Sequence, residues 1–356
     1  MSALKPGATV GILGGGQLGR MLALAASPLG LRTHVYCPDP DSPAFHVTDR
    51  HTVADYEDEA ALAAFAGDVD VITYEFENVP AESADLLQHR APVRPGPLAL
   101  RTAQDRLSEK RFAAENRIAT APFAPVGGRE DFAAALEACG LPAILKTRRF
   151  GYDGKGQKRI EREADLPDAF EALGSVPCIL EGMVAFEKEL SLLAARGKDG
   201  DVQAWPLIET RQLDHILDTA IAPADVDADL ADEALAVAGR LLEGLDYVGV
   251  MAAEMFLTRD GRLLMNEIAP RVHNSGHWTI EGSATSQFAQ HIRAVCGLSL
   301  GPVDQLGICE MQNLLGDDID DWLALTKQAG VHVHHYGKTE VRPGRKMGHV
   351  TRIRRS

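Results

Sequence analysis

The sequence predicts an α/β domain with a parallel sheet at the N-terminus, followed by α+β units in the rest of the chain. Three observations support this prediction. Short apolar strands alternate with helical stretches in the first part of the chain, which is the pattern of a parallel sheet covered by helices. A Pro-rich break, VRPGP, ends that pattern, and later segments contain short strands joined by turn signals. The length of 356 residues also exceeds what one compact core usually holds.

The first unit begins with a strand, a glycine turn and a helix. Residues Thr9 to Leu13 form an apolar run that enters a glycine cluster, and Leu18 to Ala26 continue it as a helix. Further strands are expected at Thr33 to Cys37, His51 to Val53 and Val69 to Tyr74. A parallel sheet with helices on both faces accounts for this order of elements.

The first domain boundary is expected inside or near the helix that follows the Pro-rich break, RTAQDRLSEKRFAAENRI. Thr102 and Asp105 match a capping-box pattern. Apolar residues at helical spacing follow at Ala103, Leu107, Ala114 and Ile118. We therefore divide the chain into a first unit at 1–105, a small unit at 106–190 and a larger unit at 191–356.

The two later units are expected to mix short strands and helices. Around PAILKTRR and CILEGMV, these elements surround a glycine-rich loop, which suits a small α+β unit with a mobile flap. In the larger unit, the helix ADLADEALAVAGRLLEGL precedes strands at VGVMAAEMFLT and RLLMNEIAP. Arg259, Asp260 and Gly261 between those strands are a hairpin signal.

Composition excludes several classes of function. A formal net charge of −15 repels polyanions, so a long nucleic acid is not an expected partner. The five cysteines include no CxxC pair and are expected to be reduced thiols. The N-terminus lacks the pattern of a secretory signal, and no stretch approaches the roughly 20 apolar residues of a membrane helix. We therefore expect a soluble, cytoplasmic protein that does not bind a membrane.

The first glycine cluster matches GxGxxG at Gly14, Gly16 and Gly19, and Asp39 follows about 20 residues later. This is the pattern of a dinucleotide site. The same turn serves any phosphate that approaches a helix N-terminus, and it also occurs as a purely structural turn. The motif alone therefore leaves an NAD-dependent oxidoreductase as an alternative.

A second glycine cluster follows Lys146 at the end of an apolar strand. It consists of Gly151, Tyr152, Asp153, Gly154, Lys155, Gly156 and Gln157. Glycines there allow a flexible flap whose backbone amides fold over phosphates, and Lys146 and Lys155 add positive charge. No GxxxxGK[ST] occurs there, so the segment is not a Walker loop. An ordinary hairpin beside a lysine is the simpler alternative.

Two glutamates on neighbouring predicted strands, Glu254 and Glu267, are candidate metal ligands. Carboxylates side by side on paired strands form a hard oxygen site that suits Mg²⁺, and Asn266 could add a ligand. Either glutamate alone would be explained as a solvated strand residue. Apolar neighbours on both sides argue against that explanation.

A polar turn follows the second glutamate and contains Arg271, His273, Asn274 and His277. Such a set suits an anionic carbonate or carboxyl-phosphate, with Arg271 stabilising negative charge and His273 managing a proton. A lone histidine is more often structural, so the inference depends on the whole cluster.

Together the motifs resemble those of the N5-carboxyaminoimidazole ribonucleotide synthetase family, a branch of the ATP-grasp superfamily. The resemblance covers essentially the whole chain through GILGGGQLGRM, TYEFENV, LKTRRFGYDGKGQ, EGMV, YVGVMAAEMF and NEIAPRVHNSGHW. It implies an ATP-grasp fold with an N-terminal Rossmann-like (preATP-grasp) domain. It also implies a purine-biosynthesis ligase that carboxylates 5-aminoimidazole ribonucleotide with bicarbonate and ATP, through carboxyphosphate, and releases ADP and phosphate.

The resemblance also assigns a role in ATP binding to individual residues. The phosphates would be contacted by Arg106, Lys146 and the loop from Gly151 to Gln157. The adenine hinge would consist of Glu181, Gly182, Met183 and Val184, and the ribose would be bound by Glu189. Mg²⁺, or Mn²⁺ in its place, would be held by Glu254 and Glu267, with Asn266 beside them.

The remaining assignments concern the two other substrates. The catalytic residues at the bicarbonate end would be Arg271, His273 and Asn274, with Tyr152 and Asp153 reaching the substrate. The ribonucleotide phosphate would be bound by Lys338, Arg345 and Lys346, helped by Gln17 and Leu18. Relatives also imply a homodimer.

Two segments depart from the family pattern. In ETRQLDHIL, Gln212 stands where many relatives place a histidine, which leaves open a nucleotide contact from Gln212 or His215. Phe150 stands where many members have a second glycine in the flap. Separately, His332 and His334 alternate along a predicted strand in the manner of zinc ligands, although they lack a third ligand nearby in sequence.

Functions of different classes therefore remain to be separated. The oxidoreductase leaves the second glycine loop and the carboxylate pair unexplained. An idle nucleotide-binding subunit would be expected to lack Glu254 and Glu267, and both are present. Another ATP-grasp ligase, or a formyltransferase of nucleotide metabolism, is the nearest rival within the same fold.

Overall fold

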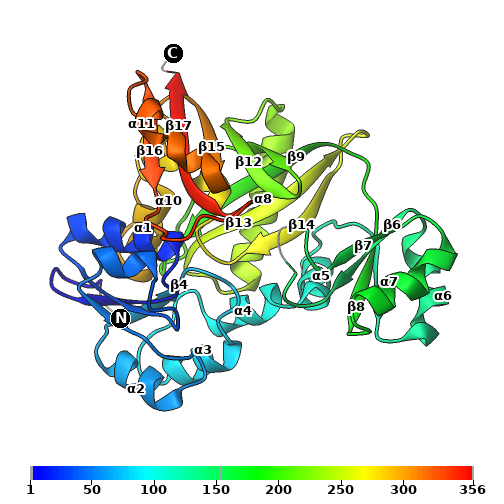
Figure 1. Ribbon diagram of the computed structural model, residues 1–356, viewed down its shortest axis with the longest axis horizontal. Coiled ribbons are helices and arrows are strands. Elements are labelled where there is room, and N and C mark those ends of the chain that lie inside the picture. Colours follow the sequence, from blue (N-terminus) through cyan, green and yellow to red (C-terminus); the bar gives the residue numbers. More distant parts are fainter. Residues whose placement is uncertain (1–2, 152–153, 355–356) are drawn as a thin grey trace.

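Three β-sheets organise the protein. The computed structural model describes residues 3–151 and 154–354. Within those ranges, a four-stranded sheet, a second four-stranded sheet and a nine-stranded sheet follow one another along the chain. The second sheet belongs to a lobe at one end of the molecule, and the first sheet lies near the opposite end (Figure 1).

The first sheet is parallel, as expected. Its strands are β1 (Thr9–Leu13), β2 (Arg32–Tyr36), β3 (Arg50–Thr52) and β4 (Val71–Tyr74), in the order β3-β2-β1-β4. Helix α1 (Gln17–Ala26) packs against one face, and α2 (Glu59–Gly67) and α3 (Ala81–Gln88) pack against the other. Ile12 and Leu13 enter these two different cores, because successive side chains of a strand point to opposite faces.

The segment after the Pro-rich break contains two helices, not the single helix expected. Helix α4 (Pro97–Ala103) ends before Asp105, and α5 (Arg106–Glu115) begins after it. The Asp105 side chain accepts hydrogen bonds from the backbone N–H groups of Leu107 and Ser108 at 3.0 and 3.3 Å. An aspartate that satisfies these free amide groups favours the start of a new helix. The expected capping box was wrong, because Thr102 lies inside α4.

The second sheet is small and antiparallel. It contains β5 (Phe123–Val126), β6 (Ala143–Thr147), β7 (Gln157–Ile160) and β8 (Cys178–Gly182), in the order β5-β8-β6-β7. Helices α6 (Phe132–Cys139) and α7 (Leu166–Ala172) close its own hydrophobic core. The second glycine cluster therefore lies in the connection between the paired strands β6 and β7.

The third sheet is antiparallel and is the largest. Its strand order is β14-β13-β9-β11-β12-β15-β17-β16, with β10 paired to β9. The strands are β9 (Phe186–Arg196), β10 (Val202–Ala204), β11 (Ile208–Leu213), β12 (Ile216–Ala222), β13 (Gly249–Thr258), β14 (Leu263–Ala269), β15 (Ile308–Leu315), β16 (Val331–His335) and β17 (Lys346–Arg354). The predicted hairpin is confirmed, because Arg259 to Gly261 joins β13 to β14 in antiparallel register.

Helices cover both faces of the large sheet. On one face, α8 (Ala228–Gly244) buries Leu230 and Leu241 in a core with Leu192 and Met251 of the sheet. On the other face, α10 (Gln287–Val295) packs in the same hydrophobic core as α1 of the first domain. The first and third sheets are thus joined by a common core, whereas the second sheet has a separate one. The short helices α9 (Thr279–Gly282) and α11 (Trp322–Leu325) complete this unit.

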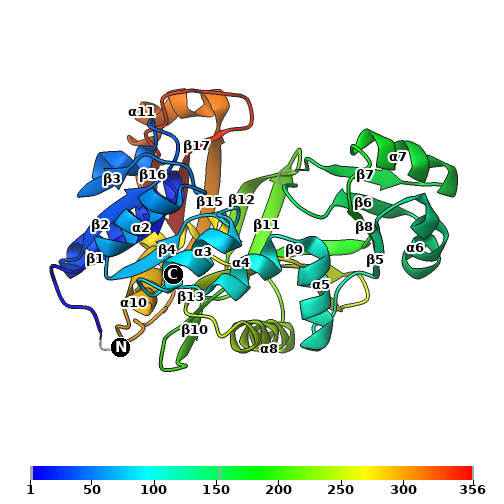
Figure 2. The same cartoon turned by 90° about the horizontal axis from the view of Figure 1, so that it is seen from below.

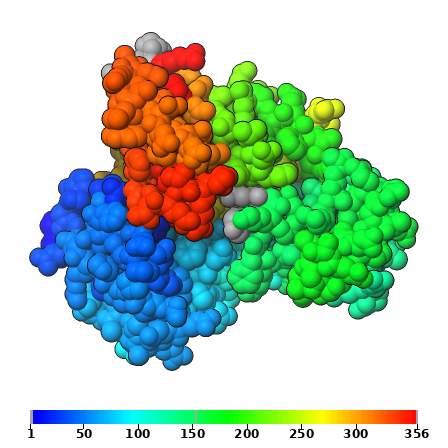
Figure 3. All heavy atoms as spheres, viewed as in Figure 1, coloured from blue at the N-terminus to red at the C-terminus, as the bar shows by residue number. Residues whose placement is uncertain are grey.

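The C-terminal segment lies next to the N-terminal domain, although the two are far apart in sequence. Figure 2 shows α4 and α5 running between the first sheet and the small lobe. In Figure 3, the orange-to-red end of the chain lies against the blue N-terminal domain. In residues 3–151 and 154–354, no helix combines the length and apolar character needed to cross a membrane.

Candidate active site

A cavity of about 770 Å³ lies between the small lobe and the large sheet. Its wall brings together most of the residues to which the sequence assigned a role. Those residues are Arg106, Lys146, Gly151, Gly154, Lys155, Gln157, Glu181, Gly182, Met183, Val184, Glu189, Glu254, Asn266, Glu267, Arg271, His273, Asn274 and Lys346. Five separate stretches of sequence, at 106, 146–157, 181–189, 254–274 and 346, thus meet in one place.

Two lysines converge on one buried carboxylate at the small-lobe end of the cavity. The Nζ atoms of Lys146 on β6 and Lys110 on α5 lie 3.0 and 3.6 Å from Oε2 of Glu181 on β8. Burial by itself raises the pKa of Glu181, but the two ammonium groups outweigh this effect and lower the pKa. Oε1 of Glu181 is buried and has no hydrogen-bond partner among the described residues.

Helix α5 also contacts the strand that carries Glu267. Nη1 of Arg106 lies 2.8 Å from Oε2 of Glu267, and Nζ of Lys110 donates to the backbone oxygen of Asn266 at 2.7 Å. Burial raises the pKa of Glu267, but the Arg106 guanidinium outweighs burial and lowers it. Glu109 is fully enclosed, and burial together with the nearby Glu267 raises its pKa to about 8. Glu109 Oε1 accepts a hydrogen bond from the backbone N–H of Ile268 at 2.6 Å.

Three carboxylates line the sheet side of the cavity. Glu254 and Glu267 are register partners across β13 and β14, so their side chains share one face of the sheet. Glu189 on β9 lies on the same side, and burial and the Glu254 charge raise its pKa to about 7. Gln212 on β11 forms a side-chain hydrogen bond with Glu189. Gln212 thus contacts the residue assigned to the ribose.

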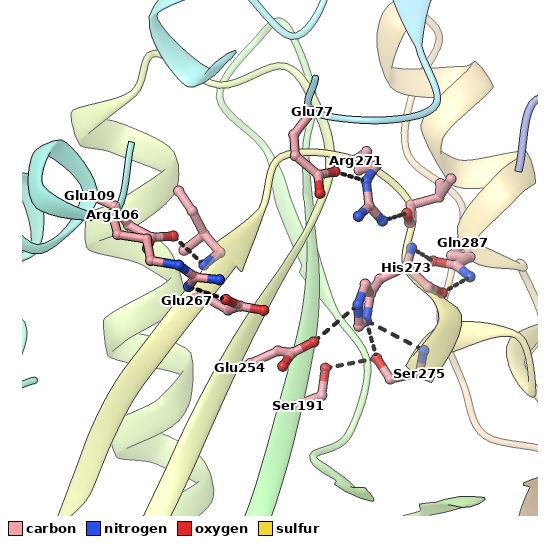
Figure 4. Close-up of polar contacts among 12 residues, drawn as sticks. Glu77, Arg106, Glu109, Ser191, Glu254, Glu267, Arg271, His273, Ser275 and Gln287 are labelled. Carbon is pink, nitrogen blue, oxygen red and sulfur yellow. Dashed lines mark hydrogen bonds and ion pairs between the residues drawn. The ribbon is translucent and has the colours of Figure 1, made fainter. Parts of the chain in front are cut away.

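The polar turn after β14 also lines the cavity. Arg271 forms an ion pair with Glu77, and this contact overcomes the effect of burial and lowers the pKa of Glu77 to about 2. Nε2 of His273 lies 3.0 Å from Oε1 of Glu254 (Figure 4). Asn274 is buried, and neither polar atom of its side chain has a hydrogen-bond partner among the described residues. A buried amide without a partner, in a cavity wall, is suited to binding a polar ligand.

The first glycine turn is filled by a carboxylate of the protein itself. Oε2 of Glu75 accepts a hydrogen bond from the backbone N–H of Gly19 at 2.6 Å, and Oε1 accepts one from Gly16. A Cβ atom on Gly14 would lie 2.3 Å from Cγ of Glu75, so the turn needs glycine to enclose this side chain. Burial raises the pKa of Glu75. The amides that a dinucleotide would use are thus already occupied, which weighs against the oxidoreductase.

The residues assigned to the ribonucleotide phosphate lie around this turn, and of the five only Lys346 lines the cavity described above. Lys338 interacts electrostatically with Glu75, Arg345 and Lys346. Its Nζ donates to the backbone oxygen of Lys346 at 2.7 Å. Gln17 begins α1, whereas the side chain of Leu18 is packed in the core. Any ligand contact from Leu18 would therefore have to come from its backbone.

The flap is described only in part. Tyr152 and Asp153 lie outside the described residues. Gly156 has a positive φ of 71°, and its backbone oxygen accepts a hydrogen bond from Thr147 N at 2.8 Å. A Cβ atom on Gly154 would lie 2.8 Å from His215 in the turn between β11 and β12. His215 thus lies beside the flap, while Gln212 contacts Glu189.

The alternating histidines of β16 have other partners. His334 pairs with Glu281 through Nε2 and stacks on His349, with ring centroids 4.4 Å apart. Among the described residues, no group of three or more His, Cys, Asp or Glu side chains is arranged to hold a metal ion. These contacts favour an ordinary strand over the zinc site.

Several residues of the site were not identified from sequence. Glu109 and Lys110 follow Arg106 at a spacing of three and four residues, so all three lie on one face of α5. This spacing could have placed both residues in the site beside Arg106. The residues that hold His273 gave no such signal, because they come from three different elements. They are Ser191, Ser275 and Gln287.

Comparison with known proteins identifies the family. Family models match residues 7–104 as a ribonucleotide synthetase preATP-grasp domain, residues 111–288 as an ATP-grasp domain, and residues 309–356 as a phosphoribosylaminoimidazole carboxylase C-terminal domain. The N5-carboxyaminoimidazole ribonucleotide synthase of Brucella melitensis is 51% identical over 355 residues, which cover 99% of this chain and 98% of that protein.

Solved structures agree with this comparison. The Staphylococcus aureus N5-carboxyaminoimidazole synthetase complexed with ADP has a TM-score of 0.95 and 38% identity, covering 100% of this chain and 95% of that one. The Aspergillus clavatus N5-carboxyaminoimidazole synthase in complex with ADP and 5-aminoimidazole ribonucleotide has a TM-score of 0.92 and 32% identity, covering 99% and 95%. The chain belongs to the N5-carboxyaminoimidazole ribonucleotide synthase family of ATP-grasp ligases.

Proposed function

We propose that this chain uses ATP and bicarbonate to carboxylate the exocyclic amine of 5-aminoimidazole ribonucleotide, releasing ADP and phosphate, in purine biosynthesis. One observation carries the proposal. A single cavity is lined by the lysine-rich small lobe, the paired glutamates of β13 and β14, and the polar turn at residues 271–274. The relative from Aspergillus clavatus, solved with ADP and 5-aminoimidazole ribonucleotide, supports the same pair of ligands for this chain.

The nucleotide is assigned to the small-lobe end of the cavity. Lys146 and Arg106 supply positive charge for the phosphates, and the loop at 151–157 covers them. Residues 181–184 form the adenine hinge, and the unpartnered Oε1 of Glu181 suits an N–H donor of the base. Glu189 takes the ribose hydroxyls. Phosphoryl transfer needs mainly positioning and charge stabilisation, which this set of residues can supply.

The donor set fits a magnesium ion. Glu254, Glu267 and the Asn266 side chain offer oxygen ligands, which Mg²⁺ and Mn²⁺ prefer, and the two glutamates share one face of the hairpin. When bound, the ion would neutralise charge on the ATP phosphates. Arg106 forms an ion pair with Glu267. When Glu267 holds the ion, the Arg106 guanidinium would be released from this carboxylate to contact an ATP phosphate.

The polar turn is assigned to bicarbonate. An oxygen of bicarbonate attacks the γ-phosphorus of ATP, ADP leaves, and carboxyphosphate forms. The amine then takes up the carboxyl group, from carboxyphosphate or from CO₂ released beside it, and phosphate leaves. Arg271 stabilises the anion, Asn274 offers its unpartnered amide, and His273 lines the same cavity. Closure of the flap excludes water that would hydrolyse the intermediate.

The ribonucleotide phosphate is assigned to the C-terminal segment. Lys338, Arg345 and Lys346 place three cationic side chains near the first glycine turn, where Gln17 and the backbone of Leu18 complete the site. Tyr152 and Asp153 of the flap complete the substrate contacts. This region lies beside Glu75, which accepts hydrogen bonds from the backbone N–H groups of Gly16 and Gly19.

The proposal includes the organisation of the protein. We propose domains at 1–105, 106–190 and 191–356, a cytoplasmic location and a homodimer. The division is supported by the separate core of the small lobe. The homodimer is tested by light scattering coupled to size-exclusion chromatography, where a mass near the 38.3 kDa of one chain would contradict it.

The decisive experiment measures phosphate release from ATP with Mg²⁺, with and without aminoimidazole ribonucleotide and bicarbonate. We expect release to depend on the ribonucleotide, and labelled bicarbonate to enter an acid-labile product. Release stimulated by an amino acid or by formate instead would favour another ATP-grasp ligase or a formyltransferase. Binding of ATP without any release would indicate an idle nucleotide-binding subunit.

A further inference from the structure

The imidazole of His273 is held in a ring of hydrogen bonds that joins its own turn to strands β9 and β13. Nδ1 lies 2.8 Å from Oγ of Ser275, and Oγ of Ser275 lies 2.8 Å from Oγ of Ser191 on β9. Nε2 lies 3.0 Å from Oε1 of Glu254 on β13. Ser191 and Glu254 are register partners, so the backbone of the sheet closes the ring (Figure 4).

The directions of these hydrogen bonds follow from the available donors. The backbone N–H of Ser275 points to Nδ1 at 3.4 Å, so Nδ1 is an acceptor. The hydroxyl of Ser275 then donates to the same lone pair. Because a serine has one hydroxyl proton, Ser275 must accept the bond it shares with Ser191. The remaining imidazole proton lies on Nε2 and is donated to the Glu254 carboxylate.

The backbone of His273 is held as well. Gln287 on α10 accepts from the backbone N–H of His273 at 2.8 Å and donates to its backbone oxygen at 2.6 Å. Ser191, Ser275 and Gln287 each have 0% of their surface exposed. Because these side chains are shielded from bulk solvent, each polar group depends on these partners, and a lost partner leaves an unsatisfied buried group.

We propose that Ser191 and Ser275 are positioning residues that hold His273 in the tautomer with its proton on Nε2. The imidazole then presents an N–H donor to Glu254 and the bicarbonate end of the cavity, and its lone pair is turned into the protein. The role that this tautomer would have in catalysis rests on the proposed function. The proposal narrows the expectation that His273 manages a proton, because the nitrogen that faces Glu254 carries a proton and no free lone pair, so it can donate a hydrogen bond but cannot accept a proton.

A first experiment tests the tautomer without any turnover. In ¹⁵N-histidine-labelled protein without ligands, two-bond proton–nitrogen spectra distinguish a protonated ring nitrogen from an unprotonated one. The His273 signals are assigned by their loss in His273→Gln. We expect an unprotonated Nδ1 and a protonated Nε2. The opposite pattern, or an equal mixture of the two tautomers, would overturn the proposal, whatever reaction the protein catalyses.

A second experiment tests the two serines. Ser275→Ala removes the hydroxyl that bonds Nδ1, and Ser191→Ala removes the donor that orients it. The matched control is Ser83→Ala, which removes a buried serine hydroxyl on α3 that donates to the backbone oxygen of Tyr56 at 2.6 Å. Thermal unfolding of all three variants separates folding from positioning.

We expect Ser275→Ala to mix the two His273 tautomers and to lower kcat on the order of ten-fold, as for the loss of one buried hydrogen bond, with the KM for ATP unchanged. Ser191→Ala should have a smaller effect of the same kind, and Ser83→Ala should keep the wild-type kcat. A wild-type tautomer in Ser275→Ala, or a kcat equal to that of Ser83→Ala, would refute the positioning role.

A wild-type protein whose phosphate release does not respond to the ribonucleotide would instead refute the proposed function. The tautomer measurement would still decide whether the two serines position His273.

Discussion

Glu254 and Glu267 are register partners on β13 and β14, yet each carboxylate holds a different neighbour. Glu254 lies 3.0 Å from Nε2 of His273, and Glu267 lies 2.8 Å from Nη1 of Arg106. The repulsion between the two glutamates across the hairpin is therefore partly offset, because each carboxylate has its own hydrogen-bond donor. A metal ion placed between them would take over the role of Arg106 at Glu267.

The first prediction follows from this arrangement. Glu267→Gln removes a charged oxygen ligand and should reduce phosphate release at least about 100-fold, because charge stabilisation by a bound ion contributes several kcal/mol. The fold should be retained, since Gln can still accept from Arg106. The measurement is phosphate release as a function of Mg²⁺ concentration. Glu171→Gln, which changes an exposed glutamate paired with Arg129, is the control. Near-normal activity with an unaltered Mg²⁺ requirement would remove the metal assignment.

The second prediction concerns Lys346 at the start of β17. Lys346→Ala should raise the KM for the ribonucleotide roughly ten-fold, since a charge-assisted hydrogen bond contributes about 1.5–3 kcal/mol. The KM for ATP should stay the same. Initial rates with each substrate varied in turn provide the measurement. Lys327→Ala changes an exposed lysine near α11 and serves as the control. An unchanged ribonucleotide KM would argue against the C-terminal segment as the phosphate site.

The third prediction is a pH dependence that comes from Lys338. Burial and the nearby cations Arg345 and Lys346 lower the pKa of Lys338 to about 8. The side chain is charged below that pH and loses its charge above it, whereas the ribonucleotide phosphate, with a second pKa of about 6, stays a dianion. The KM for the ribonucleotide should therefore rise as the pH increases above about 8.

Lys338→Arg provides the test of this pH dependence. Arginine stays charged throughout this range, so the variant should show a flat KM profile between about pH 7 and about pH 9.5. Rates are measured with the ribonucleotide varied and ATP saturating. If the wild-type KM is equally flat, or if the rise persists in Lys338→Arg, the effect does not belong to Lys338.

Local patterns were sufficient to predict much of this molecule. The strands of the first sheet, the hairpin at Arg259 to Gly261 and the position of Lys146 before the glycine loop all depend on residues close in sequence. The pairing of Glu254 with Glu267 follows directly from that hairpin. Turn chemistry and alternation act over a few residues, which is why the sequence reveals them.

Features that depend on tertiary contacts could not be predicted in the same way. Glu75 follows β4 and fills the first glycine turn, although it lies 59 residues after Gly16 and 56 residues after Gly19 in the sequence. The break between α4 and α5 involves Asp105, which also pairs with Arg148 of the small lobe. Ser191 and Gln287 approach His273 only when β9 and α10 are in place. None of these contacts leaves a periodic signal in the chain.

The last prediction concerns the enclosed carboxyl group of Glu109. Its pKa is raised from 4.5 to about 8 by burial and by Glu267. Between these two pH values the folded protein keeps a proton that the unfolded chain has lost, so the stability contributed at this site decreases as the pH rises from 4.5 to about 8.

Glu109→Gln should remove this penalty, because glutamine resembles the protonated acid and its oxygen can still accept from Ile268 N–H. We expect a higher midpoint of thermal unfolding at about pH 8, by roughly 2–4 °C for each kcal/mol recovered, and a difference that shrinks towards pH 4.5. The control is Glu115→Gln, an exposed glutamate at the end of the same helix, which should behave like wild type. A loss of stability in Glu109→Gln of equal size at both pH values would contradict this prediction, because it would mean that Glu109 is ionised in the folded protein as a partner of Lys110.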